Sequence, residues 1–180
     1  MTAIPTARRL DALILEVPRL ATARLLLREP RADDFERFAA NAADPVARQH
    51  IGGVLDRAEA WRRFHSMAGQ WMMQRVGWWM VEEPSLGAIG TVGVFRRETG
   101  PELEIGWSID RPFWGKGYAP EAAQASLDFA ADLPGGERII AYVGVTNAAS
   151  CRVADKIGMK REAEVDFYAS KHWLYVRTRS

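Results

Sequence analysis

The chain has 180 residues, 48% of them hydrophobic and 26% charged, with 24 basic and 23 acidic side chains and a net charge of +1. This composition predicts one domain with a single core and gives no reason to expect a nucleic acid or a membrane as partner. The single cysteine, Cys151, excludes an internal disulfide framework and is typical of a reducing compartment, so we expect a cytoplasmic protein. The apolar run after Arg8 and Arg9 is interrupted by Asp11 and Glu16, so neither a signal peptide nor a membrane span is expected.

The first half of the chain predicts one strand and two helices. Residues 1–19 are expected to form an N-terminal extension to a domain that spans the whole chain, and the run RLLLRE from Arg24 predicts the first strand. The acidic pair at 33–34 can cap a short helix that runs to about Ala42. Asp56 is followed three residues later by a glutamate, which is a capping-box pattern, and apolar residues then recur at helical spacing. A second, amphipathic helix is therefore expected there.

The second half predicts a mostly antiparallel sheet. Three β-rich runs are separated by the turn residues of PSLG and ETGP, which favours three successive antiparallel strands. An alanine-rich helix, a strand, a helix closed by glycine and a terminal hairpin follow. The expected elements are strands at 77–83, 88–96 and 102–110, a helix at 118–131, a strand at 138–145, a helix at 147–157 and a hairpin within 162–177. The predicted fold class is mixed α/β.

The stretch PFWGKGYAPEA, residues 112–122, joins the third of these strands to the alanine-rich helix. A glycine turn at a helix N-terminus presents free backbone N–H groups and the positive end of the helix dipole, which suits a phosphate or pyrophosphate. Gly115 and Gly117 allow close approach, and Pro120 lies in the first helical turn, where its missing N–H costs little. The dinucleotide pattern fails at Pro120, and the triphosphate loop fails because Lys116 is followed by glycine. A plain turn that binds nothing is the alternative.

Three ordered blocks resemble the GNAT superfamily of acyl-coenzyme A N-acyltransferases, in particular its RimJ/RimL-like branch. The blocks are LATARLLLREPRADD at 20–34, ELEIGWSIDRPFWGKGYAPEA at 102–122 and NAASCRVADKIGMK at 147–160. The resemblance covers nearly the whole chain and implies a central, mostly antiparallel, twisted sheet of about six to seven strands flanked by about four helices. It also implies direct transfer of an acetyl group from acetyl-coenzyme A to a primary amine of a small molecule or of a protein or peptide N-terminus. Such a protein is expected as a monomer or a homodimer.

The same resemblance implies a coenzyme site, because in this family the glycine turn holds the pyrophosphate and the strand before it pairs with the pantetheine arm. The corresponding residues here are Trp107, Ser108, Ile109, Phe113, Trp114, Gly115, Lys116, Gly117, Tyr118 and Ala119. Asn147 resembles the asparagine that contacts the coenzyme arm, although helix capping alone would also explain it. Arg152 and Lys156 are candidates for phosphate contacts, with plain helix-surface exposure as the alternative. The chain departs from the broad family pattern at Pro112, where many members carry Gln or Arg.

The implied reaction needs a base, since an unperturbed alkylammonium has a pKa of about 10. Glu104 resembles the strand carboxylate that serves as base in several members, often through water, and Glu102 on the same strand face is the second candidate. Both could instead be solvated carboxylates. The tyrosine that usually protonates the departing thiolate is replaced by Ala154, and Ser150 matches a serine that can act instead in this branch. A hydroxyl that bonds the backbone at a helix N-terminus explains Ser150 equally well.

Acceptor specificity has weaker sequence signals. Trp71, Trp78, Trp79 and Trp107 could line an apolar cleft that desolvates the amine, or could simply be core residues. The segment RQHIGG at 48–53 is either a rim with glycine hinges or an ordinary loop. The three histidines, His50, His65 and His172, show no metal-ligand spacing, so no metal is predicted. Cys151 has no histidine in its motif and is expected to be an inert buried thiol.

Two other classes of function stay open on sequence alone. The first is an acyl-coenzyme A-binding sensor or interaction module that kept the glycine turn without turnover, which the missing tyrosine favours and Glu104 with Ser150 disfavours. The second is a nucleotide-binding regulatory domain, which requires the glycine turn to bind ATP or NAD. A ligand that binds only the native state raises the melting temperature, so thermal shifts separate these classes.

Overall fold

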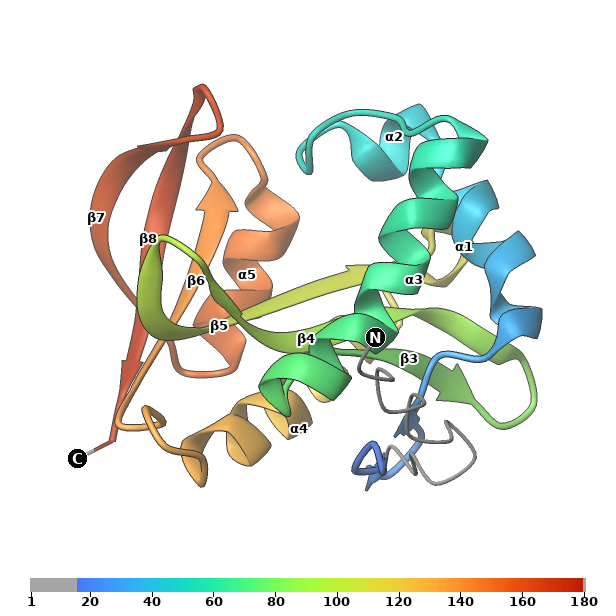
Figure 1. Cartoon of the computed structure of the whole chain (residues 1–180). Helices are drawn as coiled ribbons and strands as arrows, with labels where there is room; N and C mark the ends of the chain where they lie inside the picture. Colours follow the sequence, from blue (N-terminus) through green and yellow to red (C-terminus); the bar gives the residue numbers. More distant parts are fainter. Residues whose placement is uncertain (1–15, 180) are drawn as a thin grey trace, which may run out of the picture.

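The structure is a computed structural model that describes residues 16–179. These residues form one sheet of eight strands in the order β1-β2-β3-β4-β5-β6-β8-β7, in which β5 and β6 run parallel and the other neighbours antiparallel (Figure 1). The strands are β1 (Leu20–Ala21), β2 (Leu26–Arg28), β3 (Trp78–Glu83), β4 (Gly87–Arg97), β5 (Gly100–Ile109), β6 (Arg138–Gly144), β7 (Lys160–Phe167) and β8 (Ser170–Thr178). The mixed, mostly antiparallel fold is confirmed.

The helices agree with the predicted ones, with one addition. They are α1 (Phe35–Ala42), α2 (Pro45–Arg48), α3 (Arg57–Gln74), α4 (Tyr118–Ala131) and α5 (Ala148–Lys156), with short 3-10 helices η2 (Ala32–Asp34) and η3 (Arg111–Phe113). The extra helix, α2, begins after Asp44, whose carboxylate accepts from the amide of Val46 at 2.8 Å. The extra strand, β1, has two residues, which is too short for any periodicity in the sequence to reveal.

Helix capping follows the sequence at α3 and departs from it at α1. The Asp56 carboxylate accepts from the Glu59 amide at 2.7 Å, and the Glu59 carboxylate accepts from the Asp56 amide at 3.0 Å, so the capping box of α3 is confirmed. Asp34 precedes α1 as expected, but its carboxylate does not cap that helix. It accepts instead from the buried Arg28 guanidinium and from the Arg31 amide before η2, with all three distances 2.8 Å.

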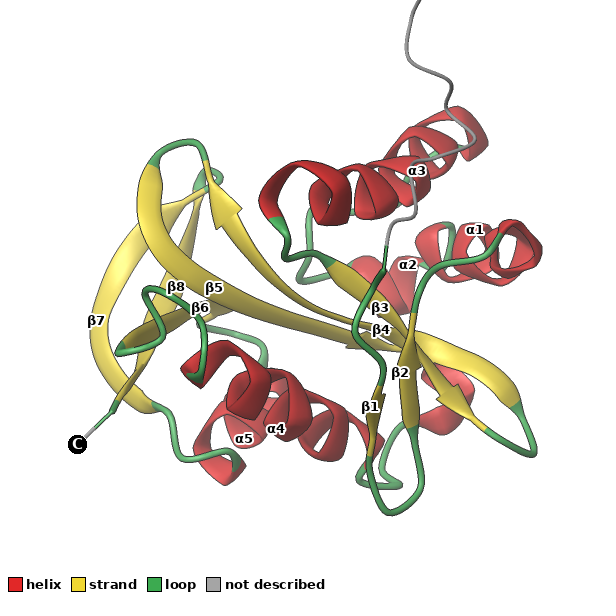
Figure 2. Cartoon of the chain, turned by 60° about the horizontal axis from the view of Figure 1, so that its bottom comes forward, coloured by secondary structure: helices red, strands yellow, loops and turns green. Residues whose placement is uncertain are grey.

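Helices cover the two faces of the sheet unequally (Figure 2). Helices α4 and α5 pack on one face, which we call the helical face, and contribute Ala123, Leu127 and Ala154 to the main core. Helices α1 and α3 pack over the opposite face at the β3 and β4 end, where Phe35 and Phe64 contact Met80 in a second cluster. The remaining part of that opposite face, over β5, β6, β8 and β7, carries Glu104, Tyr142 and His172, and we call it the open face.

Candidate active site

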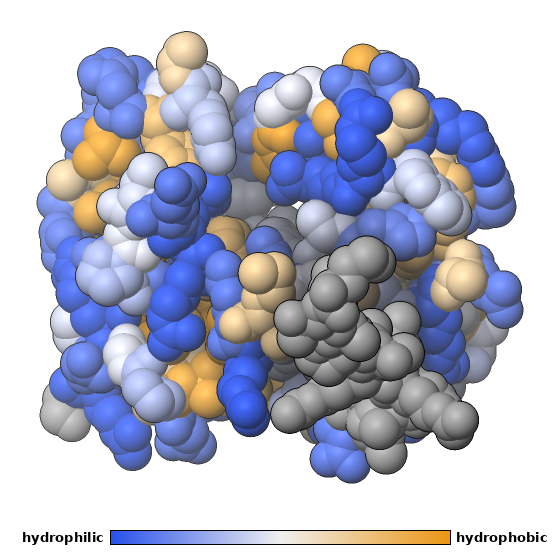
Figure 3. Space-filling model, in the orientation of Figure 1, coloured by the Kyte–Doolittle hydropathy of each residue, from blue (hydrophilic) through white to orange (hydrophobic). Residues whose placement is uncertain are grey.

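Strands β5 and β6 diverge near the middle of the sheet. Their ladder consists of Leu103↔Ile139 and Glu104↔Ile140, although β5 continues to Ile109 and β6 to Gly144. From Ile105 to Ile109 the edge of β5 that faces β6 has no strand partner among residues 16–179. The surface is hollowed at this place, between the side that carries β7, β8 and α5 and the side that carries α2 and α3 (Figure 3). We call this opening the mouth. An unpaired strand edge offers backbone N–H and C=O groups to an extended ligand.

The glycine turn follows directly after this edge. Gly115 has φ +77° and Gly117, the residue that precedes α4, has φ +82°, which is the left-handed region that glycine adopts without strain. The backbone N–H groups of residues 115–119 donate no hydrogen bond to any residue in the range 16–179. They gather at the positive end of the helix dipole of α4. This is the arrangement of an anion-binding turn.

A distant residue, Arg24, fixes the shape of the turn. It donates from Nη1 to the Lys116 carbonyl at 2.9 Å and forms an ion pair with Glu121 at 2.6 Å, and its guanidinium lies 4.7 Å from the ring centroid of Tyr118. These contacts tie the segment before β2 to the turn and to the first turn of α4. Sequence reasoning missed Arg24, because a contact across more than ninety residues leaves no local pattern.

The other predicted coenzyme residues lie around the same turn. Phe113, Tyr118 and Ala119 are half-buried against the main core, whereas Trp114 is 46% exposed. The Trp114 indole donates to the Ile109 carbonyl at 2.5 Å, so this carbonyl at the end of the β5 edge already has a partner. Of the predicted strand residues, Ser108 lies on the open side of β5 with its hydroxyl 3.5 Å from Asn41 Nδ2, and Trp107 packs partly against the core.

Helix α5 begins at the far side of the mouth. Asn147 caps it, since its side chain accepts from the Ser150 amide at 3.0 Å. The Ser150 side chain is half-buried, and its hydroxyl forms no hydrogen bond within the described residues. Arg152 is exposed, with no ion pair to any residue of 16–179, and Cys151 is buried at 8% exposure. Ser150 is therefore placed to interact with a ligand, and Asn147 is already used as a cap.

Glu104 lies at the point where β5 and β6 separate. Its side chain is buried, with the residue 5% exposed, and both carboxylate oxygens accept from the Arg97 guanidinium, with Nη2 at 2.7 Å from Oε1. Burial raises the pKa of Glu104, and the hydrogen bonds and charge of Arg97 oppose this rise. Glu102 occupies the same strand face two residues earlier and is half-buried. Only Glu104 of the two predicted carboxylates lies at the mouth in a fixed pair with a cation.

Two aromatic pairs flank Glu104 on the open face. Trp78 stacks on Phe95 with centroids 5.1 Å apart, and Tyr142 stacks on Phe167 with centroids 4.2 Å apart. Trp78 can lie flat on the sheet because Gly106 has no side chain: a Cβ there would come within 2.8 Å of the indole. Arg97 connects the two pairs.

The contacts of Arg97 reach across to the terminal hairpin. Its guanidinium lies 5.3 Å from the Phe95 ring centroid and 4.7 Å from that of Phe167, and Nη1 donates to the Tyr168 hydroxyl at 3.1 Å. The hairpin between β7 and β8 is thereby fastened over Glu104. None of these aromatic partners on the hairpin was predicted, because Phe167 and Tyr168 meet Arg97 only through the fold.

The sequence profile of the Acetyltransferase (GNAT) domain matches residues 24–160 of this chain. The chain belongs to the GNAT acetyltransferase family. It is therefore an acyltransferase, as the resemblance of its motifs implied. The chain is 32% identical to the uncharacterized protein YkkB of Bacillus subtilis over 146 residues, which covers 78% of this chain and 84% of the relative. It is also 32% identical to the uncharacterized N-acetyltransferase YnaD of Bacillus subtilis over 144 residues, which covers 79% and 83% of the two chains.

Solved structures of the same family share the fold. An acetyltransferase from Agrobacterium tumefaciens superposes with a TM-score of 0.82 at 28% identity, covering 93% of this chain and 98% of that one. The RimL ribosomal L7/L12 α-N-protein acetyltransferase, in complex with coenzyme A, superposes with a TM-score of 0.75 at 16% identity, covering 89% and 98%. At 16% identity, the comparison with RimL shows only that the two proteins share the fold.

Of the two alternatives for the four tryptophans, cleft or core, the core holds for Trp71 and Trp79. Trp71 is 2% exposed and Trp79 is fully buried, and their rings pack against each other with centroids 4.7 Å apart. Both belong to the main core of this GNAT domain, as does the half-buried Trp107 in part. Only Trp78 reaches the open face. The strand alternation in GWWM explains the difference, since neighbouring tryptophans point to opposite faces.

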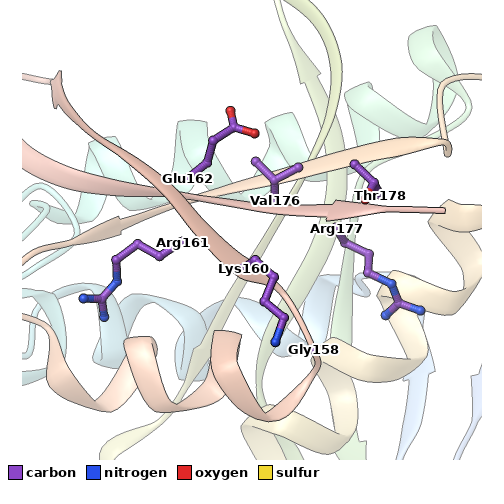
Figure 4. Close-up of a pocket in the computed structure, with 7 residues that line it drawn as sticks. All are labelled: Gly158, Lys160, Arg161, Glu162, Val176, Arg177 and Thr178. Carbon is purple, nitrogen blue, oxygen red and sulfur yellow. The ribbon is translucent and has the colours of Figure 1, made fainter. Parts of the chain in front are cut away.

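Two cavities lie away from the strand edge at 105–109. One, of about 410 Å³, is lined by the β7 and β8 hairpin near the end of α5, and Figure 4 shows Lys160 and Arg177 pointing to the same side of it. The other, of about 250 Å³, lies where Arg37 donates to Asp110 at 3.2 Å. No helix within residues 16–179 is long and apolar enough to cross a membrane. In the same range no group of three or more His, Cys, Asp or Glu side chains could hold a metal ion.

Proposed function

We propose that this protein is an acetyl-coenzyme A-dependent N-acetyltransferase that transfers the acetyl group directly to a primary amine in a ternary complex. The observation that carries the proposal is the joint geometry of the strand edge at 105–109 and the unpaired amides at 115–119. An edge of extended backbone followed by an anion-binding turn matches a ligand with an amide-bearing arm and a pyrophosphate. Acetyl-coenzyme A is such a molecule, and the GNAT family uses it as acetyl donor.

The residues present fit this donor. The amides of residues 115–119 would bind the pyrophosphate, and the edge of Trp107 to Ile109 would pair with the pantetheine arm, with the Ile109 carbonyl contributing only if the Trp114 indole releases it. When bound, acetyl-coenzyme A supplies an activated thioester at the mouth. Ser150, whose hydroxyl has no hydrogen-bond partner among residues 16–179, is proposed to donate the proton that the departing thiolate takes up.

The acceptor is proposed to enter from the open face. Glu104 lies there between two aromatic pairs, and its negative charge favours a cationic ammonium over a neutral group of the same size. Its role as the base, directly or through water, stays a prediction, as does that of Glu102. Small amines and protein or peptide N-termini both carry the required group, so the acceptor class is a question for experiment.

A thiol-release assay tests the proposal. Acetyl-coenzyme A is incubated with the protein and a panel of amines, amino acids, aminoglycosides and short peptides with free N-termini. Release that depends on one class of acceptor is the expected result. Tight coenzyme binding with no release above hydrolysis would favour the sensor instead, and a larger thermal shift with ATP or NAD than with acetyl-coenzyme A would contradict the donor site itself.

A further inference from the structure

His172 stands at the open end of the mouth. It lies on β8 directly opposite Gly144, the last residue of β6, and is 9% exposed. Residues that pair across neighbouring strands share a face, so His172 belongs to the open face together with Glu104 and Tyr142. Its Nε2 atom points toward Gly144, where a Cβ would come within 4.0 Å of it. The imidazole therefore borders the opening between β5 and β6.

The hydrogen bonds of this imidazole define its tautomer. Nδ1 lies 3.2 Å from the Ser170 carbonyl oxygen, and a carbonyl can only accept, so Nδ1 carries the hydrogen. In the neutral ring Nε2 is then the atom with the lone pair. Nε2 has no hydrogen-bond partner among residues 16–179. The edge-to-face contact with Phe167, at 5.3 Å between centroids, holds the ring plane. A fixed ring with an unused lone pair is the form that a general base requires.

Both carboxylate oxygens of Glu104 are already hydrogen-bonded in the observed arrangement. The Arg97 guanidinium occupies both of its oxygens, so protonation would break a charge-assisted pair in a buried place. An imidazole, by contrast, is the side chain whose ordinary titration range lies nearest neutral pH, where general-base catalysis is most efficient. His172 thus has a nitrogen free to accept a proton, whereas both oxygens of Glu104 are hydrogen-bonded to Arg97.

We propose that His172 is a further catalytic residue, the base that removes the proton from the acceptor amine. This inference rests on the proposed acetyl transfer. The amine nitrogen forms a bond to the acetyl carbon, the carbon–sulfur bond breaks, the proton of the amine passes to Nε2 of His172, and the thiolate leaves and takes up a proton. The Glu104 carboxylate, on the same face, stabilises the imidazolium that results.

The surroundings of the ring are compatible with this role. The titratable and charged groups that face it are Glu104 on β5, Arg97 on β4, Tyr142 on β6 and His50 in the segment after α2. Burial first, and then the nearby Glu104 carboxylate, raise the pKa of Tyr142, so the phenol stays protonated and does not compete as a base. His50 contacts the Thr146 hydroxyl at 3.3 Å, which can donate or accept and leaves its tautomer open. His50 is the rival base at the mouth.

The test uses the full chain and the acceptor that the thiol-release panel identifies. His172→Asn keeps an N–H donor near the position of Nδ1 but has no titrating lone pair. We expect kcat to fall about 100-fold, with unchanged affinity for acetyl-coenzyme A and loss of the acid limb from the pH profile of kcat/KM. His172→Ala, which leaves room for an added base, should regain activity when imidazole is supplied.

The matched control is His65→Gln. His65 is exposed on α3, and its Nδ1 also lies next to a backbone carbonyl, that of Trp61, at 2.9 Å. Its substitution should leave the rate and the pH profile unchanged. A His172→Asn enzyme that retains the wild-type pH profile would overturn the inference while the proposed function stands. Loss of the acid limb in His50→Gln instead would assign the proton to His50 and overturn it as well.

A second measurement separates this inference from the proposed function, because it needs no turnover. Nitrogen-15 NMR of the protein, which has three histidines, reports the tautomer of each ring, with His172→Asn identifying the signal. We expect the Nδ1–H tautomer for His172. An Nε2–H tautomer would overturn the inference even in an active enzyme. Absence of thiol release together with the Nδ1–H tautomer would contradict the proposed function and with it the base role, while leaving the geometry of the ring intact.

Discussion

The proposed donor side and the proposed acceptor side of the mouth are built from different kinds of groups. On the donor side the recognition groups are backbone atoms, namely the strand edge at 105–109 and the amides at 115–119. Any residue type that is compatible with the backbone conformation provides these groups. On the acceptor side they are side chains from five strands, held by stacking and by the pair of Arg97 with Glu104. A site made of backbone binds the same ligand in many sequences, whereas a site made of side chains can change its ligand with few substitutions.

The largest expected effect is on the donor side. Gly117→Val places a β-branched residue at φ +82° and brings its Cβ within 3.3 Å of Arg24 Nη2, so the turn must change shape. We expect affinity for acetyl-coenzyme A to fall about 100-fold in calorimetry, which is about 2.7 kcal/mol. Gly87→Val is the control, since Gly87 has φ +76°, no atom near its Cβ position, and is the first residue of β4, directly after the β3–β4 turn. Equal loss in both variants would mean general strain rather than a donor site.

A smaller effect is expected on the acceptor side. Glu104→Gln keeps the shape of the side chain but removes the charge that Arg97 pairs with and that favours a cationic acceptor. We expect kcat to fall about 30-fold at neutral pH, with partial recovery at high pH, where free amine accumulates, and with unchanged coenzyme affinity. Glu102→Gln serves as the comparison on the same strand face. A larger loss in Glu102→Gln would move the acceptor-side role to that residue.

Removing Arg24, which holds the glycine turn in place, should reduce coenzyme affinity by a smaller factor. Arg24→Ala removes the hydrogen bond to the Lys116 carbonyl and the ion pair with Glu121, leaving the amides of the turn in place but less fixed. A loss of about fivefold in coenzyme affinity is expected, because a mobile turn must be ordered on binding. Arg19→Ala, which removes an exposed pair with Glu29, is the matched arginine control. If both variants bind alike, the turn needs no help from Arg24.

The smallest effect concerns the boundary between strand edge and turn. Burial raises the pKa of Asp110, and the Arg37 hydrogen bond and charge oppose this rise. A raised pKa in the folded state means that the ionised form disfavours folding above the unfolded pKa of about 3.9, and that this penalty disappears below it. Asp110→Asn should therefore have a slightly higher melting temperature than the wild type at pH 7, which corresponds to under about 1 kcal/mol in the free energy of unfolding. Near pH 3 the two proteins should have the same melting temperature. A lower melting temperature at pH 7 would show that Arg37 outweighs burial.

The fold and the glycine turn before α4 could largely be predicted from sequence. Alternation of apolar residues, the capping box at Asp56 and the glycine pair at 115 and 117 are local patterns, and each depends on the conformation of a few neighbouring residues. A local pattern did not suffice where a side chain had two possible partners. The carboxylate of Asp34 was expected to cap α1 and instead pairs with Arg28, which comes from β2.

The acceptor side could not be predicted in the same way. The sequence left two alternatives for Trp71 and Trp79, the cleft or the core, and both lie in the core. Composition cannot tell which face of an element a residue occupies. Glu104 was found through its place in a motif, but its partner Arg97 was not, although only seven residues separate them. In the β4–β5 hairpin Phe95 lies opposite Glu104, and a register shift before Arg97 lets its guanidinium reach the carboxylate. The register of that hairpin is set by the whole sheet.

The sequence by itself determined the elements, the family and the position of the anion-binding turn, since these depend on propensities and backbone conformations that short segments carry. The tertiary structure alone decided that β5 and β6 part after Glu104, that Arg24 holds the turn, and that Glu104, Tyr142 and His172 share the open face. These contacts join residues that are far apart in the sequence, with 92 positions between Arg24 and Lys116. They follow from strand order and register, which are properties of the complete sheet rather than of any segment in it.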